Sequence, residues 1–480
     1  MANEFIGRNE LAAQEEIKLS DIDVLLINPA PPRVDRVAEH LGIASLKAFL
    51  LSRGIETETL DMSIEQVSVS ETVDQILAAQ PRIVGVSMLD DTKDSGFSVI
   101  RQLSTRGFGG KIVLGGYFPT FASKDILRDF PDVDFVVRGE GEITLFELVE
   151  FELGKDGAKP IEQIEGLSYR HDGQIVENPS RPLIADLDIL PPVDRKYAPQ
   201  VLSAGQYLSV FATRGCWGSC SFCDIVGLYG ISKGKRWRRR SVERLVDELE
   251  DLAHRFNTRH FIFNDDQFLV KGNSAYRLVD EFASELERRN LKIEFELMCR
   301  ADTVNRKVMQ RLKDIGLKRV FLGLESFDEK QLQRMNKRIS VRQNLKAVIT
   351  LYKLKIDVIA SVILADAYTK LWDLLLQFTI LYILRKRYFN SEHSKISVNK
   401  KLEVYRGSPV YQEYKRKGIL TKDHYLTGCD YKLKFWTNLR LKMLSLEEGA
   451  ARFLFRPKMN STRVGDEFQL NMTPLKQKQA

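Results

Sequence analysis

The sequence predicts an α/β protein in which two runs of alternating strands and helices follow one another, with a small, mostly helical region after them. Short apolar stretches alternate with stretches of helical spacing over residues 22–155, and the alternation returns over residues 204–405. Strands that read as continuous apolar runs are covered on both faces, which is typical of a doubly wound parallel sheet. Between the two runs, residues 156–203 are rich in turn signals and proline. The length of 480 residues suits two or three domains.

The first run begins after a polar arm over residues 1–21. Its predicted strands lie at residues 24–28, 55–60, 83–87, 111–114 and 134–137. Its predicted helices cover residues 41–53 and 71–80 and a stretch that starts at about Ser95. Such sheets bind ligands at the carboxyl ends of their strands, so we expect a site at the loops over residues 29–33, 88–94 and 115–120. Gly115 and Gly116 would let a flat ligand approach the backbone closely.

For residues 156–203, between the two runs, the sequence predicts a small β-hairpin followed by an extended linker. The hairpin is predicted around Asp172 and Gly173, and Pro191 and Pro192 make the next stretch extended.

The second run predicts six βα units in a row. Its strands are expected at residues 207–213, 260–264, 293–298, 319–323, 357–364 and 402–405. Its helices are expected at residues 242–256, with Ser241 as the N-cap, and at about 275–289 and 306–315. Residues 406–480 are expected to be mostly helical and to end in a polar tail.

Composition is that of an ordinary soluble globular protein, and we expect it in the cytoplasm. The five cysteines are clustered rather than paired, and the first residues lack the features of a signal peptide. The apolar stretch over residues 371–384 is too short to span a bilayer and is interpreted as a buried amphipathic helix. The basic run over residues 233–240 favours a solvated loop over a nucleic-acid surface.

Three of the five cysteines fall within residues 215–224, which read G-C-W-G-S-C-S-F-C-D, directly after the first strand of the second run. Cys216, Cys220 and Cys223 could converge on one metal centre. A structural zinc site would need a fourth ligand, and none lies nearby in the sequence. Three cysteines on a cluster of four irons would leave one iron open to bind a substrate. The alternatives are a zinc site and buried thiols without a metal.

This Cys-x3-Cys-x-aromatic-Cys spacing resembles the signature of radical S-adenosylmethionine (radical SAM) enzymes. The resemblance implies a partial (β/α)6 barrel over residues 204–405 and a [4Fe-4S] cluster ligated by Cys216, Cys220 and Cys223. In that family the open iron binds SAM, whose cleavage yields a 5′-deoxyadenosyl radical that abstracts hydrogen. The SAM contacts implied at the strand ends are Phe222, Asp265, Asp266, Arg300 and Glu325.

Residues 22–155 resemble the cobalamin-binding domain that precedes many radical SAM cores. The matching phrases are L-G-I-A-S-L at residue 41, I-V-G-V-S at 83, V-L-G-G-Y-F-P-T at 113 and V-R-G-E-G-E at 137. The implied cobalamin contacts are Met88, Leu89, Gly115, Gly116 and Tyr117. The chain lacks the Asp-x-His-x-x-Gly motif that ligates cobalt in other cobalamin proteins, so imidazole ligation is not expected. The alternative is a relic domain that binds nothing.

The resemblance implies a cobalamin-dependent radical SAM methyltransferase that acts on an unactivated carbon of a small molecule. One SAM would methylate cobalamin, and a second would yield the radical that prepares the substrate for the methyl group. The expected partner is an electron donor such as flavodoxin or ferredoxin, and neither nucleic acid nor a membrane span is expected. Two alternatives stay open: a radical reaction without methylation, such as rearrangement, cyclisation or reduction, and a non-catalytic iron–sulfur sensor or scaffold.

Overall fold

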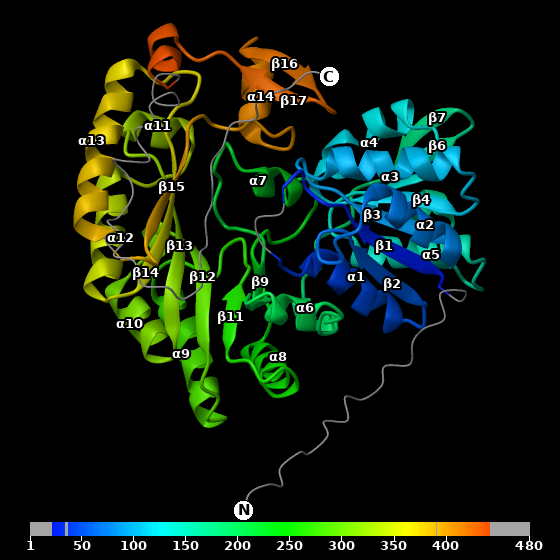
Figure 1. Ribbon diagram of the computed structural model, residues 1–480, viewed down its shortest axis with the longest axis horizontal. Coiled ribbons are helices and arrows are strands. Elements are labelled where there is room, and N and C mark those ends of the chain that lie inside the picture. The colour runs from blue at the N-terminus through cyan, green and yellow to red at the C-terminus, as the bar shows by residue number, and fades with distance from the viewer. Residues whose placement is uncertain (1–21, 34–36, 390, 442–480) are drawn as a thin grey trace, which may run out of the picture.

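The computed structural model describes residues 22–33, 37–389 and 391–441. Figure 1 shows two α/β lobes side by side, the first in blue and cyan and the second in green and yellow, with an orange hairpin above the space between them. The predicted polar arm and the polar tail lie outside the described residues.

The first lobe is built on a seven-stranded sheet of order β2-β1-β3-β4-β5-β6-β7. Its first five strands are mutually parallel: β1 (Val24–Asn28), β2 (Thr57–Asp61), β3 (Ile83–Ser87), β4 (Lys111–Gly115) and β5 (Phe135–Val137). The predicted hairpin forms as β6 (Leu167–His171) and β7 (Gln174–Glu177), and β6 pairs antiparallel with β5. The sheet is therefore mixed rather than wholly parallel, because a short two-residue turn can only return the chain antiparallel.

Helices cover both faces of this sheet, as a doubly wound fold requires. The helices are α1 (Leu41–Leu51), α2 (Val69–Ala79), α3 (Lys93–Thr105), α4 (Tyr117–Asp129) and α5 (Glu142–Glu152). Ile43 of α1 and Leu148 of α5 pack on one face of the sheet. Phe97 of α3 and Ile126 of α4 pack on the other. The boundaries proposed for the domains and the linker stay predictions.

The second lobe contains a six-stranded parallel sheet of order β15-β14-β13-β12-β11-β8. The strands are β8 (Leu208–Val210), β11 (His260–Phe263), β12 (Glu294–Arg300), β13 (Leu317–Glu325), β14 (Asp357–Ile363) and β15 (Lys395–Asn399). Helices lie along its outer side: α8 (Val242–Arg255), α9 (Asn273–Arg288), α10 (Arg306–Asp314), α11 (Glu329–Arg334), α12 (Val341–Lys353) and α13 (Leu371–Tyr388). Ser241 caps α8 by accepting a hydrogen bond from the Arg244 N–H, which confirms the predicted N-cap.

The sixth strand was predicted in the wrong place. It is β15, and residues 402–405 form no strand. Leu402 and Val404 look strand-like because they are buried, but they pack against Tyr414 and Tyr431. The edge strand itself is only half-buried, so its sequence carries a weak apolar signal.

The stretch predicted as a buried amphipathic helix forms α13, which buries one face and leaves apolar side chains exposed on the other. Leu374 and Leu384 face the core, whereas Trp372 is 78% exposed and Ile383 is 53% exposed. Among the described residues, no helix combines the length and apolar character needed to cross a membrane.

The C-terminal region contains more than helices. After α14 (Pro409–Arg416), the chain forms an antiparallel hairpin of β16 (Leu420–His424) and β17 (Gly428–Tyr431). The remaining short elements are α6 (Ala198–Ser203), β9 (Thr213–Arg214), α7 (Asp224–Leu228), β10 (Arg238–Arg239) and the 3-10 turns Ile161–Gln163, Leu187–Ile189 and Ala301–Thr303.

Candidate functional site

The three predicted cysteine ligands lie on one loop, residues 215–223, between β9 and α7 (the cysteine loop). Asp265, at the end of β11, fixes the start of this loop. Its Oδ1 accepts hydrogen bonds from the N–H of Ala212 (2.9 Å) and the hydroxyl of Thr213 (2.7 Å). Its neighbour Asp266 accepts one from the Gly215 N–H (3.0 Å). The segment that follows β11 therefore holds the start of the cysteine loop through two adjacent carboxylates.

The thiols are at least half-buried and lie close to donors. The Gly218 N–H donates to Cys216 Sγ, and Arg300 Nη1 lies 3.2 Å from Cys220 Sγ. Burial raises the pKa of Cys216, and it raises the pKa of Cys223 to about 12. Within the described ranges no three Cys, His, Asp or Glu side chains surround a single ion. The three thiols thus share one loop, and their role as ligands of an iron–sulfur cluster, in which each cysteine would bind a different iron, stays a prediction.

Arg300 and Glu325 form part of a buried polar network beside the cysteine loop. The Arg300 guanidinium also donates to Asp302 (3.0 Å) and to the Lys337 carbonyl (2.5 Å). Lys337, which is 4% exposed, pairs with Glu325 at 2.8 Å. Two of the five predicted SAM contacts thus lie together at the carboxyl ends of β12 and β13.

Asp265 and Asp266 differ in what they can reach. Desolvation raises the pKa of Asp265 to about 7 and that of Asp266 to about 6, and in each the hydrogen bonds from the loop oppose this rise. Asp265 is 1% exposed, and its Oδ2 has no hydrogen-bond partner among the described residues. Asp266 lines a cavity. The structure therefore leaves Asp266 the more accessible of the two for a ligand. Phe222 is half-buried and packs near Met335 and Leu402.

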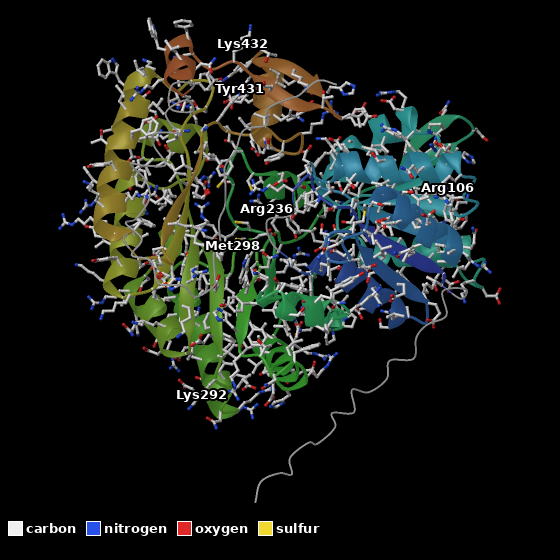
Figure 2. All side chains as sticks on the ribbon, in the orientation of Figure 1. Arg106, Arg236, Lys292, Met298, Tyr431 and Lys432 are labelled. Carbon is white, nitrogen blue, oxygen red and sulfur yellow. The ribbon has the colours of Figure 1, made fainter. Side chains whose placement is uncertain are left out.

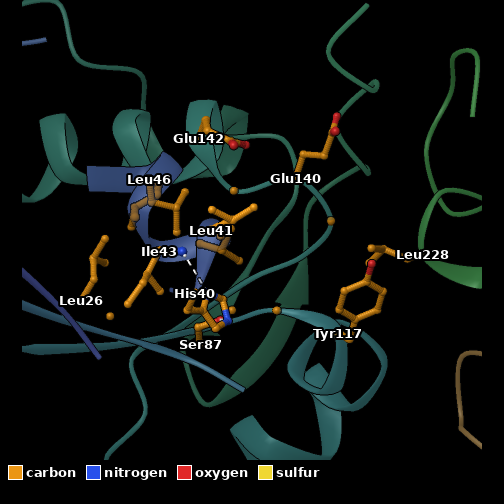
Figure 3. A pocket seen from close by; sticks show the side chains of 18 of the residues that line it. Leu26, His40, Leu41, Ile43, Leu46, Ser87, Tyr117, Glu140, Glu142 and Leu228 are labelled. Atoms are coloured by element: carbon orange, nitrogen blue, oxygen red, sulfur yellow. Dashed lines mark hydrogen bonds between the residues drawn. The ribbon is translucent and has the colours of Figure 1, made fainter. Parts of the chain in front are cut away.

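A cavity of about 310 Å³ lies between the lobes, at the carboxyl ends of the first sheet (Figure 3). Its walls come from β1, β3, β4, α1 and α5 of the first lobe and from Phe211, Arg214 and Asp266 of the second. Six glycines are among the residues that line it: Gly42, Gly85, Gly115, Gly116, Gly139 and Gly141. Such backbone lining permits close approach of a large flat ligand, so this cavity fits the predicted cobalamin site.

Four of the five predicted cobalamin contacts line this cavity: Leu89, Gly115, Gly116 and Tyr117. The fifth, Met88, is fully buried in the sheet core and does not line it. Gly116 adopts φ +97°, and a Cβ there would lie 2.8 Å from the Met88 carbonyl oxygen. Met88 thus makes glycine necessary at this turn and shapes the cavity indirectly.

His40 was missed by the sequence analysis, although it directly precedes the L-G-I-A-S-L phrase. It is the N-cap of α1, and its Nδ1 accepts a hydrogen bond from the Ile43 N–H at 3.1 Å (Figure 3). Its Nε2 lies 3.5 Å from Ser87 Oγ, at the cavity wall. Burial lowers the pKa of His40, so the ring is neutral and carries its proton on Nε2.

Buried ion pairs join the two lobes around this cavity. Arg214, just before the cysteine loop, pairs with Glu142 at 2.6 Å, and Arg238 pairs with Glu140 at 2.8 Å. Burial raises the pKa of Glu142, but the Arg214 guanidinium more than offsets this and holds the pKa below its usual range. The V-R-G-E-G-E phrase thereby anchors the first lobe to the cysteine loop.

A second cavity, of about 1100 Å³, lies between the first lobe and the C-terminal hairpin. Leu89 and Tyr117 line both cavities, so the two cavities are adjacent. Asp224, which directly follows Cys223, also lines the second cavity, and desolvation raises its pKa. The second cavity therefore borders both the first cavity and the residue that follows the cysteine loop.

Comparison with known families matches residues 33–149 to the B12 binding domain and residues 210–367 to the Radical SAM superfamily. This chain is a radical SAM protein with a B12-binding domain. The two domains imply three cofactors: cobalamin, a [4Fe-4S] cluster and SAM. Radical SAM enzymes also need an electron donor.

Individual relatives are distant. An uncharacterized methyltransferase of Pyrococcus horikoshii is 29% identical over 71% of this chain and 73% of its own length. An anaerobic magnesium-protoporphyrin IX monomethyl ester cyclase of Synechocystis is 28% identical over 65% of this chain and 63% of its own length. The solved structure of the cobalamin-dependent radical enzyme OxsB superposes with a TM-score of 0.76 at 20% identity, covering 90% of this chain and 67% of that one. The last match bears on the fold alone.

His40 leads to a prediction about this radical SAM protein. Because Nδ1 caps α1 and Nε2 carries the proton, the ring can donate a hydrogen bond but not ligate cobalt. We expect cob(II)alamin bound to the wild type and to His40→Asn, which keeps a capping side chain, to give the same electron paramagnetic resonance spectrum without nitrogen splitting from imidazole. Nitrogen splitting that disappears in the variant would contradict this prediction.

Proposed function

We propose that the protein is a cobalamin-dependent radical SAM methyltransferase acting on an unactivated carbon of a small molecule. The observation that supports it best is that the two cavities share Leu89 and Tyr117 as wall residues and that Asp224, next to the cysteine loop, lines the second. Methyl transfer requires the methyl donor and the site of hydrogen abstraction to reach the same substrate carbon. A substrate in the second cavity would face both the B12-binding domain and the radical SAM domain.

We propose that these side chains bind and position the cluster and SAM. Cys216, Cys220 and Cys223 would ligate the cluster, and the Arg300 guanidinium would offset negative charge at Cys220 sulfur. Asp266 could accept hydrogen bonds from the SAM ammonium group, and Phe222 and the Glu325–Lys337 pair would line the same strand ends. When bound, the cluster with SAM supplies the abstracting radical and cobalamin supplies the methyl group.

Tyr117 is proposed to separate the two cavities as a neutral phenol. Desolvation and nearby acidic groups, including Asp266 and Asp224, raise its pKa well above the ordinary value. A neutral phenol keeps a hydrogen-bond donor at the junction without adding charge.

The first test uses the anaerobically purified protein, reconstituted with iron and sulfide and titrated with cobalamin while absorbance is followed. We expect four irons and one cobalamin per chain, and transfer of label from methyl-labelled SAM to product. A four-iron cluster without cobalamin binding would contradict the methyl-transfer scheme.

The same experiment separates the other candidates. The cyclase relative favours a radical reaction without methylation, which would cleave SAM and bind cobalamin but leave no label in the product. A sensor or scaffold would hold the cluster without cleaving SAM.

A further inference from the structure

The six basic side chains of residues 233–240 differ in their surroundings, and Arg239 is exposed and paired with Glu281. Arg238 and Arg240 turn inward, where they pair with Glu140 and Glu248. Lys233 and Lys235 are exposed and Arg236 is half-buried. Within the described ranges, the ion pairs of this run belong to Arg238, Arg239 and Arg240, and none involves Lys233, Lys235 or Arg236. We name these three residues the basic surface. They concentrate three uncompensated positive charges within four residues.

The basic surface is adjacent to the cysteine loop. A Cβ on Gly215 would lie 1.9 Å from the Arg236 carbonyl oxygen, so the two backbones are in close contact one residue away from Cys216. The glycine, at φ +77°, is what permits this approach. Figure 2 shows Arg236 near the middle of the molecule, where the two lobes meet.

Two half-buried tryptophans lie beside the same loop. Trp237 donates to the Gln267 carbonyl (2.8 Å) and Trp217 to the Leu269 carbonyl (3.0 Å), so both hold the chain that follows β11. Lys271 Nζ lies 4.6 Å and the Arg300 guanidinium carbon 4.8 Å from the centre of the Trp217 ring, and Arg300 contacts Cys220 sulfur. Both tryptophans thus hold the segment after β11 beside the cysteine loop, and Trp217 contacts the arginine that lies against Cys220 sulfur.

The three cations do not face the space where a small substrate would bind. Neither of the cavities between the lobes is lined by Lys233, Lys235 or Arg236. Their charge is available to a macromolecule that approaches from outside.

We propose that the basic surface docks an acidic electron-transfer protein that reduces the cluster. The inference rests on the proposed function, since only a redox-active cluster needs such a donor. The donor, a reduced flavodoxin or ferredoxin, loses one electron and the cluster gains it. Complementary charge accelerates such encounters by about 10- to 1000-fold, and the effect is screened by salt.

The test measures cluster reduction by stopped-flow absorbance at low ionic strength, with flavodoxin hydroquinone as the probe. We compare the wild type, K233E/K235E and the control K155E/K292E, in which two exposed lysines away from the cysteine loop receive the same charge change. Figure 2 shows Lys292 at the foot of the second lobe. We expect the rate with flavodoxin to fall at least about 10-fold in K233E/K235E and to stay near wild type in the control. Reduction by dithionite should be equal in all three.

Each other outcome overturns the proposal. Equal flavodoxin rates in all three proteins would exclude docking at this surface, and an equal fall in the control would assign the effect to net charge. Loss of tRNA binding in K233E/K235E with an unchanged flavodoxin rate would make this a nucleic-acid surface. Failure of the proposed function is visible separately, because it appears as absent SAM cleavage or methyl transfer with dithionite as the reductant.

Discussion

Replacing Cys220 by alanine is expected to abolish the iron–sulfur cluster and all SAM cleavage. Cys220 is 7% exposed, and its sulfur lies 3.2 Å from Arg300 Nη1. Removal of the sulfur leaves two ligands for a cluster that needs three and leaves the guanidinium facing an apolar methyl group. Iron content and the visible absorbance after reconstitution provide the measurement, and Cys216→Ala and Cys223→Ala should behave alike.

The matched control is Cys429→Ala. Cys429 is half-buried on β17, in the C-terminal hairpin. This variant should retain the full iron content and SAM cleavage. Four irons per chain in the Cys220 variant would contradict the assignment of the cysteine loop as the cluster site.

Replacing Arg238 by alanine is expected to lower the free energy of unfolding by about 3–5 kcal/mol, because it leaves the Glu140 carboxylate buried with a weakened set of partners. The side chains of this pair are only 3% and 8% exposed. Arg238 also donates to the Ile184 carbonyl at 2.8 Å, so the variant loses a second contact. Urea denaturation followed by fluorescence is the measurement.

The next residue of the same strand is the control. Arg239 pairs with Glu281, and the side chains of this pair are 37% and 45% exposed. Arg239→Ala should cost no more than about 1 kcal/mol, because water solvates both partners and screens their attraction. An equal loss of unfolding free energy in Arg238→Ala and Arg239→Ala would show that burial of the ion pair does not determine its contribution to stability.

Local patterns predicted much of the fold. The strands of the first sheet and the hairpin at Asp172 and Gly173 follow from apolar runs and turn residues, which act over a few neighbouring positions. The edge strand β15 was misplaced because an edge needs little burial, and its apolar signal is weaker than that of Leu402 and Val404. The C-terminal hairpin was missed because β16 is largely exposed and polar.

Part of the site could also be predicted. Asp266, Arg300 and Glu325 were expected at strand ends and lie there, and Leu89 and Tyr117 were expected at the first sheet and line its cavity. Met88 was expected there as well, but its side chain is in the core, because the side chains of adjacent residues point in opposite directions at the end of a strand. His40 was not predicted, since a histidine before a helix carries no signal of the cavity that it lines.

The sequence by itself determined the order of the two α/β runs and the cysteine spacing, since both are local properties of the chain. Only the tertiary structure decided which charges are buried. Arg214 pairs with Glu142 across 72 residues. Arg238 of the basic run pairs with Glu140 across 98 residues and is buried, whereas Lys233 and Lys235 of the same run stay exposed. Contacts between residues so far apart depend on how the lobes pack, and packing of this kind leaves no periodic pattern in the sequence.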